Sequence, residues 1–248
     1  MKKLNRLLFL FLAAATATFT SCSTDIEPLD PSISGETPTE NPGENPGENP
    51  GTPSGDYWPM AVNNTWTYKN NGVQEPPMKI VSTQQINGKT YYKYSNFIGT
   101  TTMQGLEFSA NVWSRKEGST YFIRQDATIP AQGGNPSITV LPTEVQILKD
   151  NLAVNETWTH TYTQTVVFGG MEIPSPVEIV GKVLEKDAQL TINGQDFSEV
   201  IKIQVTQNSQ GVSQSNYYWF AKNIGLIKFQ NDFITSETSY EIVSYNLN

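Results

Sequence analysis

The chain is poor in the side chains that most enzymes and metalloproteins use. Its 248 residues include one cysteine, Cys22, and one histidine, His160. A single cysteine cannot form a disulfide within the chain, and the two side chains are too few for a zinc site. The sequence has no Gly-x-Ser-x-Gly elbow, Walker sequence or dinucleotide-binding glycine pattern. We therefore predict no catalytic, cofactor or metal site, and a protein that is not an enzyme. A calcium site made of carboxylate and carbonyl oxygens is the alternative, although the sequence has no calcium-loop motif.

Charge is also scarce, and it is unevenly distributed. Only 16% of the residues are charged, and the formal net charge is −8. Residues 22–56 carry eight acidic side chains and no basic one, whereas residues 57–248 are nearly balanced, with 16 acidic and 13 basic side chains. No basic stripe is present to neutralise phosphates, so the sequence disfavours nucleic acid as a partner.

Long apolar runs are missing apart from residues 7–15, LLFLFLAAA. This run follows Lys2, Lys3 and Arg6, and it is too short to span a bilayer as a helix, which is typical of a signal peptide. Residues 19–22, FTSC, resemble the bacterial lipobox, in which the cysteine is lipidated and becomes the new N-terminus. We predict a signal peptide over 1–21 and a membrane anchor of several acyl chains on Cys22, which holds a membrane firmly. A plain secretory signal is the alternative.

The segment after Cys22 predicts a localisation signal and a disordered tether. Residues 23–27, STDIE, resemble the export signal that directs Bacteroidota lipoproteins to the cell surface. We therefore expect an outer-membrane lipoprotein that is surface-exposed, with a periplasm-facing anchor as the alternative. Asn-Pro-Gly recurs at 41–43, 45–47 and 49–51, and this composition favours a disordered linker over 22–56. Fully extended at about 3.1 Å per residue, residues 30–55 would reach roughly 75 Å.

Residues 57–248 read as an all-β domain. Short runs rich in threonine, valine, isoleucine and tyrosine alternate with turn signals, among them Asn87-Gly88 and Asn193-Gly194, and Asn-Gly favours tight β-hairpins. We predict an antiparallel curved sheet or an incomplete barrel. The best helical pattern is 143–152, where a threonine precedes Val145, Leu148 and Leu152.

An internal repeat organises this domain. The motif AVNNTWT at 61–67 recurs as AVNETWT at 153–159, and Ile-Asn-Gly at 86–88 recurs at 192–194. Recurring hairpin chemistry explains the second pair but explains the first one poorly. We predict two related repeats, about 57–140 and 141–248. Trp66 and Trp158 should then occupy equivalent buried positions.

Two motifs resemble a known group of sequences. Residues 57–68, YWPMAVNNTWTY, resemble the opening YFPLxxGxxWxY of an uncharacterised Bacteroidota lipoprotein family, and residues 218–228, YWFAKNIGLIK, resemble its closing YxAxxVGLVK. Asn63 stands where that family has glycine, and asparagine also reaches the left-handed backbone region. The resemblance implies a lipoprotein and says nothing about activity.

Aromatic pairs are the remaining lead. Neighbouring residues of a strand point to opposite faces, so one member of each pair should leave the core. The candidate ligand-binding residues are Tyr91, Tyr92, Tyr217 and Tyr218. We predict a non-catalytic β domain that binds a glycan or an apolar ligand at the cell surface.

Two other functions remain open. The domain could be a structural or assembly partner of an outer-membrane protein complex, or a hydrolase that uses paired carboxylates. For Glu178, Glu185 and Glu199 we favour solvated strand faces. Since His160 takes the repeat position of Tyr68, we expect it to serve in packing rather than as a catalytic base.

Overall fold

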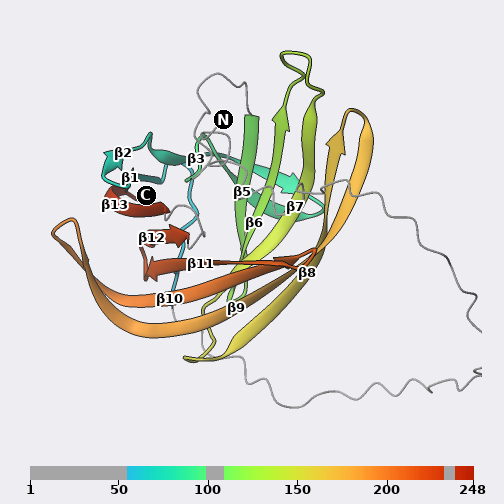
Figure 1. Ribbon diagram of the computed structural model, residues 1–248. Coiled ribbons are helices and arrows are strands. Elements are labelled where there is room, and N and C mark those ends of the chain that lie inside the picture. The colour runs from blue at the N-terminus through green and yellow to red at the C-terminus, as the bar shows by residue number, and fades with distance from the viewer. Residues whose placement is uncertain (1–54, 99–108, 232–237) are drawn as a thin grey trace, which may run out of the picture.

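The computed structural model describes residues 55–98, 109–231 and 238–248, which form an all-β domain (Figure 1). The predicted signal peptide, Cys22 and nearly all of the tether lie outside the described residues, so those assignments stay predictions. Within the described ranges, no helix is long and apolar enough to cross a membrane.

Apart from β2, which pairs only with β1, the described strands follow one another as antiparallel neighbours. They are β1 Thr65–Asn70, β2 Val73–Gln74, β3 Met78–Ile86, β4 Lys89–Tyr94, β5 Ser109–Glu117, β6 Thr120–Ile129, β7 Ile138–Lys149, β8 Thr157–Phe168, β9 Met171–Ile192, β10 Gln195–Ser209, β11 Val212–Ala221, β12 Gly225–Asn231 and β13 Thr238–Asn246. β13 also pairs with β1, so the sheet closes into a twelve-stranded barrel, with β2 as a short extension beside β1. The predicted fold class is confirmed, and the barrel is complete rather than partial.

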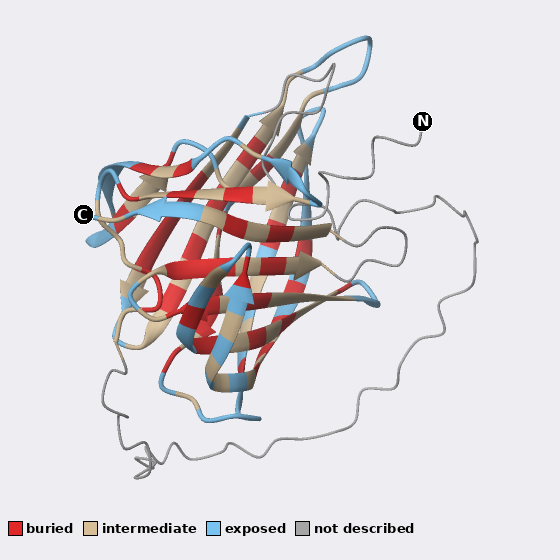
Figure 2. Cartoon of the chain, turned by 90° about the vertical axis from the view of Figure 1, so that its left-hand side faces the viewer, coloured by how far each residue is buried: buried red, intermediate tan, exposed pale blue. Residues whose placement is uncertain are grey.

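Along the strands, side chains that face the barrel interior alternate with side chains that face outward. Figure 2 shows buried and less buried residues taking turns along the strands, as a sheet with one face inside requires. The predicted hairpins are present: Asn87, Gly88, Asn193 and Gly194 all have positive φ. That conformation suits the two-residue turns whose twist matches the flanking strands.

Residues 143–149 belong to strand β7, so the predicted helix is wrong. Val145 pairs with Ile123 and Leu148 with Tyr121, which puts both on the inner face although they are three residues apart. The register shifts between these pairs, so β7 carries an extra residue at this point. A β-bulge therefore produces the spacing that the sequence pattern attributes to a helix.

The two AVNxTWT motifs adopt the same local structure. Asn63 and Asn155 have φ of 76° and 72°, in the left-handed region. Asn63 N donates to Ile80 O at 2.9 Å, and Asn155 N donates to Val183 O at 2.8 Å. Trp66 and Trp158, which follow these turns, are both buried, as the repeat predicts. A duplication of the whole domain remains a prediction.

The N-terminal part of the domain packs into one end of the barrel, here called the tether end. Tyr57 and Trp58 are buried there, and Asn223 N donates to Asp56 O at 2.6 Å. The long β9–β10 hairpin bends across this region toward β13 (Figure 1), where Asn193 Nδ2 donates to Ile242 O at 2.8 Å. The opposite end, where β8 turns into β9 and β10 into β11, is called the far end.

Candidate functional site

The four predicted tyrosines do not form one site. Tyr218 faces the barrel interior, and Tyr217 lies on the outer wall, as alternation requires. Tyr92 packs against the core and borders an open cleft at the tether end. Tyr91 belongs to a polar cluster on the outer wall. The structure thus separates the candidates, and only Tyr218 lines an internal cavity.

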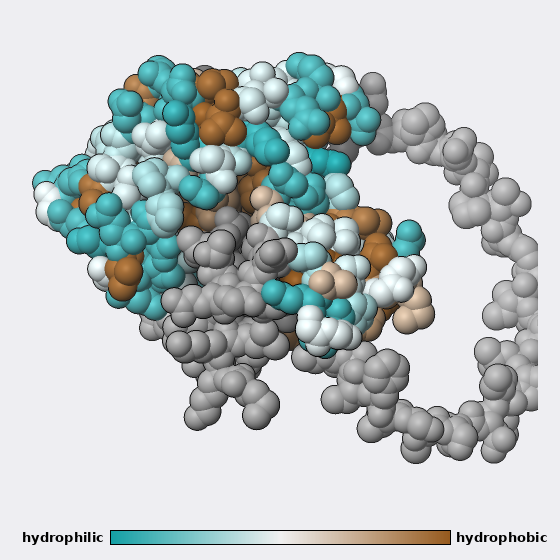
Figure 3. Space-filling view, turned by 90° about the horizontal axis from the view of Figure 1, so that it is seen from above, coloured by the Kyte–Doolittle hydropathy of each residue, from teal (hydrophilic) through white to brown (hydrophobic). Residues whose placement is uncertain are grey.

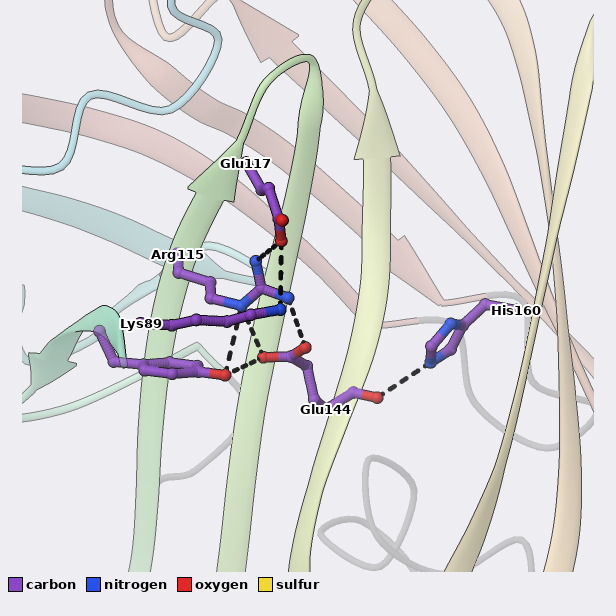
Figure 4. Close-up of polar contacts among 6 residues, drawn as sticks. Lys89, Arg115, Glu117, Glu144 and His160 are labelled. Atoms are coloured by element: carbon purple, nitrogen blue, oxygen red, sulfur yellow. Dashed lines mark hydrogen bonds and ion pairs between the residues drawn. The ribbon is translucent and has the colours of Figure 1, made fainter. Parts of the chain in front are cut away.

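The cluster around Tyr91 is centred on a buried arginine (Figure 4). Arg115 donates from Nε and Nη2 to the two carboxylate oxygens of Glu144, at 2.8 and 2.6 Å, and from Nη1 to Glu117 at 2.6 Å. Its guanidinium lies 3.8 Å from the ring centre of Phe122. Tyr91 donates its hydroxyl to Glu144. The guanidinium therefore has partners on every side, and the cluster ties β4, β5 and β7 together rather than leaving a charge for a ligand.

The ion pair shifts the titration of Glu144. Burial alone would raise the pKa of this carboxyl, but hydrogen bonds from Arg115 and Tyr91, with the charge of Arg115, hold the pKa below its ordinary value. Glu144 is therefore a stable anion at neutral pH, which suits a structural ion pair better than proton transfer.

His160 reaches across a seam in the wall. Ladder pairing between β7 and β8 covers only residues 138–140 and 166–168 in the described structure. Pro142, which lacks an N–H donor, follows the last pair on β7. Beyond it, His160 Nε2 lies 3.1 Å from the main-chain oxygen of Glu144 (Figure 4). This contact is with a backbone carbonyl, so it is a packing contact rather than a nucleophile–base pair.

The ring of Trp219, on the outer wall, is covered by two lysine side chains. Lys202 and Lys228 place their ammonium groups 5.2 and 5.5 Å from its ring centre. Each lysine is in turn paired with a glutamate, Glu185 or Glu241. Because both neighbouring strands cover the indole, this ring has little free face on which a sugar could stack.

The carboxylates considered for hydrolysis are spread over the described wall. Glu178 accepts from Asn208, Glu185 pairs with Lys202, and Glu199 pairs with Lys222. Among the described residues, no three histidine, cysteine, aspartate or glutamate side chains form a group that could hold a metal ion.

The candidate site lies inside the barrel, toward the far end. A partly open cavity of about 70 Å³ lies there, with mostly apolar walls and a few polar side chains. Its polar lining comprises Gln125, Gln207, Asn216, Tyr162 and Tyr218. Burial raises the pKa of Tyr162 to about 12 and also raises that of Tyr218, so both phenols are neutral.

A polar belt surrounds this cavity on the far-end side. We define it as Gln125, Thr143, Gln164, Gln207, Gln214 and Asn216, which share the inner face through the cross-strand pairs 125/143 and 207/214 and through alternation along β8 and β11. Three of its buried atoms, Thr143 Oγ1, Gln214 Nε2 and Asn216 Oδ1, have no hydrogen-bond partner. The cavity lining and the belt contain no charged side chain.

Beyond the belt the inner face becomes apolar again. Ala127, Val140 and Val166 form a small cluster separate from the main core. Val166 pairs with Ile173 and Phe168 with Met171 at the projecting β8–β9 turn. We call Val140, Val166, Phe168, Met171, Ile173 and Val212 the collar. The β8–β9 turn points upward in Figure 1, and Figure 3, seen from above, shows apolar side chains exposed on that face.

The sequence contains a signal for this site on strand β8, away from the tyrosine pairs. Strand β8 reads TWTHTYTQTVVF, with threonine at every second position and Trp158, His160, Tyr162 and Gln164 between them. Such a strand places threonines outside and larger groups inside. A buried glutamine on the inner side, as at position 164, marks a polar layer within an otherwise apolar barrel.

Comparisons with known proteins add little about activity. No family model matches the sequence, and no curated protein matches it. One similar crystal structure is a candidate lipoprotein from Parabacteroides distasonis, 10% identical, with a TM-score of 0.41, covering 77% of this chain and 99% of that one. Another is a candidate exported protein with a YmcC-like fold from Bacteroides fragilis, 8% identical, with a TM-score of 0.39, covering 78% and 100%.

Proposed function

We propose that this protein is a lipid-anchored, non-catalytic binding protein of the outer membrane. Its barrel would hold a small, uncharged, amphipathic ligand at the polar belt. The observation that carries the proposal is the set of buried, unpartnered polar atoms, Thr143 Oγ1, Gln214 Nε2 and Asn216 Oδ1, beside an apolar cavity.

These three unpartnered atoms reduce the stability of the free protein. A buried polar group without a partner costs about 1–3 kcal/mol. A ligand or ordered water that supplies the missing hydrogen bonds recovers part of this cost. Because the lining has no charge, a charged ligand group would lose its hydration without gaining a counter-ion. A neutral hydroxyl, ester or amide group beside an apolar body fits the lining best.

The ligand test uses the neutral fluorescent probe N-phenyl-1-naphthylamine. We expect enhanced fluorescence with the wild-type protein and weaker binding after Asn216→Leu or Gln207→Leu, which remove polar groups from the cavity wall. Ser215→Ala is the matched control, since Ser215 lies on the outer face of the same strand. Equal binding by all four proteins would show that the probe does not use the barrel interior.

The membrane part of the proposal rests on the FTSC sequence at Cys22 and the acidic residues after it. We expect a palmitate analogue to label the wild type and Cys22→Ala to release the protein from membranes. Protease added to intact cells should cut the tether if the domain faces outward. Failure of the wild type to incorporate the label would refute the lipid anchor.

Glycan binding is a second candidate, favoured by Tyr217. Its ring is only half-buried on the outer wall, and Gln204 and Ser215 offer polar groups beside it. A glycan screen with the wild type and Tyr217→Ala tests this candidate without affecting the cavity. Binding that Tyr217→Ala abolishes and Asn216→Leu preserves would move the site from the interior to the wall.

A further inference from the structure

The outer part of the collar is an apolar surface that the described barrel leaves uncovered, whereas Val140 and Val166 at its inner edge are buried. Of its members, Phe168, Met171, Ile173 and Val212 are exposed by 40%, 66%, 43% and 50%. Among the residues that the structure describes, the other exposed large apolar side chains, Val62, Val73, Val81, Val154 and Tyr245, lie outside the collar. Apolar side chains gathered in one place commonly mark a site of binding.

The collar continues the inner wall of the candidate site. Along β8, Tyr162 lines the cavity, Gln164 belongs to the belt, and Val166 and Phe168 follow on the same face. Along β9, Ile179 lines the cavity and Ile173 and Met171 lie on the same face farther out. Successive inner positions are about 6.6 Å apart. A ligand group at the belt thus has the collar directly beside it.

The free edge of β9 at the collar is unsuited to strand addition. The β9–β10 ladder ends at Glu178, so residues 171–177 form ladder pairs only with β8. Ser209 Oγ donates to Pro176 O and Gln210 Nε2 to Ser175 Oγ, which leaves residues 171–174 as the free part of this edge. Pro174 and Pro176 lie within this edge and lack N–H donors, a device that blocks edge-to-edge pairing. The exposed feature that remains is therefore the apolar face, which suits an alkyl chain rather than an added β-strand.

Charge argues against an anionic membrane surface as the occupant. No lysine or arginine occurs between Asp150 and Gly181, and Glu172 lies at the start of β9, next to the projecting β8–β9 turn. Interfacial membrane binding normally combines apolar side chains with basic ones. A neutral chain that belongs to the ligand itself meets no such difficulty.

We propose that the collar seats the alkyl chain of the ligand, which makes the ligand class a single-chain amphiphile with an uncharged head group. The head group lies at the polar belt, and the chain runs along Val166, Ile173 and Met171. This inference rests on the proposed function, since it extends the same site.

The test measures how affinity depends on chain length. Monoacylglycerols of increasing acyl length compete with N-phenyl-1-naphthylamine for the full chain carrying Cys22→Ala, which removes the need for detergent. Each methylene that the collar covers should tighten binding by about fourfold. Ile173→Ser and Met171→Ser should flatten this dependence for long chains while leaving the shortest competitor and the probe unchanged. Val154→Ser, at a side chain of similar exposure outside the collar, should behave as wild type.

The outcomes separate the two proposals. Binding of the probe and short competitors with no chain-length dependence, or with a dependence that Ile173→Ser leaves intact, would overturn the collar assignment and keep the cavity. No binding of the probe or of any competitor would overturn both. A concentration-dependent dimer that Ile173→Ser dissociates, without chain-length dependence, would assign the collar to a second copy of the chain.

Discussion

The two ends of the barrel differ in how far their inner side chains are buried and hydrogen-bonded. At the tether end, Trp66 and Tyr68 are buried and hydrogen-bonded, Trp66 Nε1 to Ile224 O and Tyr68 Oη to Leu226 O, both at 2.7 Å. At the far end, Asn216 Oδ1 and Thr143 Oγ1 are buried without partners, and Met171 is mostly exposed. Trp158 Nε1 at the tether end also lacks a partner, so the clearer difference is burial, and we expect the exposed collar to contribute less to stability than the buried tether end. Local violations of packing and hydrogen bonding at the far end are typical of functional sites.

The largest effect should come from the tether end. Trp66→Ala removes a fully buried indole and should cost about 3–5 kcal/mol of the free energy of unfolding, because a cavity forms as well as apolar contact being lost. Ile173→Ser in the collar should cost within about 0.5 kcal/mol, as exposed substitutions usually do. Urea denaturation of both variants measures the contrast. Similar losses from the two variants would show that stability is spread evenly over the barrel.

The second effect concerns Trp158, whose indole lies against Gly181. Among the described glycines, Gly181 is the one whose φ is not positive, so its role here is to leave space rather than to turn the chain. A Cβ on Gly181 would lie 2.1 Å from the indole, so Gly181→Ala forces the ring or the strand to move. We expect a loss of about 1–3 kcal/mol from overpacking. Trp158→Phe alone tests the ring, and the double variant should recover part of the loss. Independent, additive losses would show that the two positions do not compete for space.

Local sequence signals were sufficient for the strands, the hairpins and the burial of both tryptophans. Asn-Gly pairs require a backbone conformation that few residues reach, so Asn87-Gly88 identifies a hairpin without knowledge of the rest of the chain. Asn63 likewise shows the left-handed conformation expected from the resemblance, with φ of 76°.

Long-range features were not predictable in this way. Closure of the barrel depends on pairing of β1 with β13, across almost the whole domain. The helix predicted over 143–152 failed because a bulge placed Val145 and Leu148 on one face. The sequence did not reveal the polar belt because its six members lie on five different strands and meet only through closure. Tyrosine pairs, in contrast, are visible in the local sequence, but the structure places their members on opposite faces of the wall.

A third effect concerns two carboxyl groups, Asp150 and Glu144, whose pKa values are shifted in opposite directions. Burial raises the pKa of Asp150, whereas the Arg115 ion pair holds the pKa of Glu144 below its ordinary value. A raised pKa means that stability is lost as the pH rises from the unfolded value through the folded one; a lowered pKa means that stability is lost as the pH falls through the folded value. Asp150→Asn should therefore gain relative to wild type between pH 4 and 7, while Glu144→Gln should lose.

The measurement is urea denaturation of the three proteins at several pH values. The differences from wild type should both shrink toward low pH, where the two carboxyls are protonated. Ser198→Ala, on the β9–β10 hairpin away from both groups, serves as a pH-independent reference. Curves for Asp150→Asn and Glu144→Gln that bend in the same direction would contradict the assigned environments.

The smallest expected effect concerns the hydroxyl of Thr143 at the far end. Thr143 is buried with an unpartnered hydroxyl, so Thr143→Val replaces a polar atom that lacks a hydrogen bond by a methyl group of similar size. If the cavity is dry in the free protein, the variant should be more stable by about 1 kcal/mol. Thr161→Val on the outer face of β8 should change stability by less than about 0.5 kcal/mol. A gain in stability together with weaker binding of a neutral amphiphile would show that the far end keeps this hydroxyl for its ligand. A loss of stability would mean that ordered water satisfies Thr143, and the contrast between the two ends would then be one of hydration rather than of missing partners.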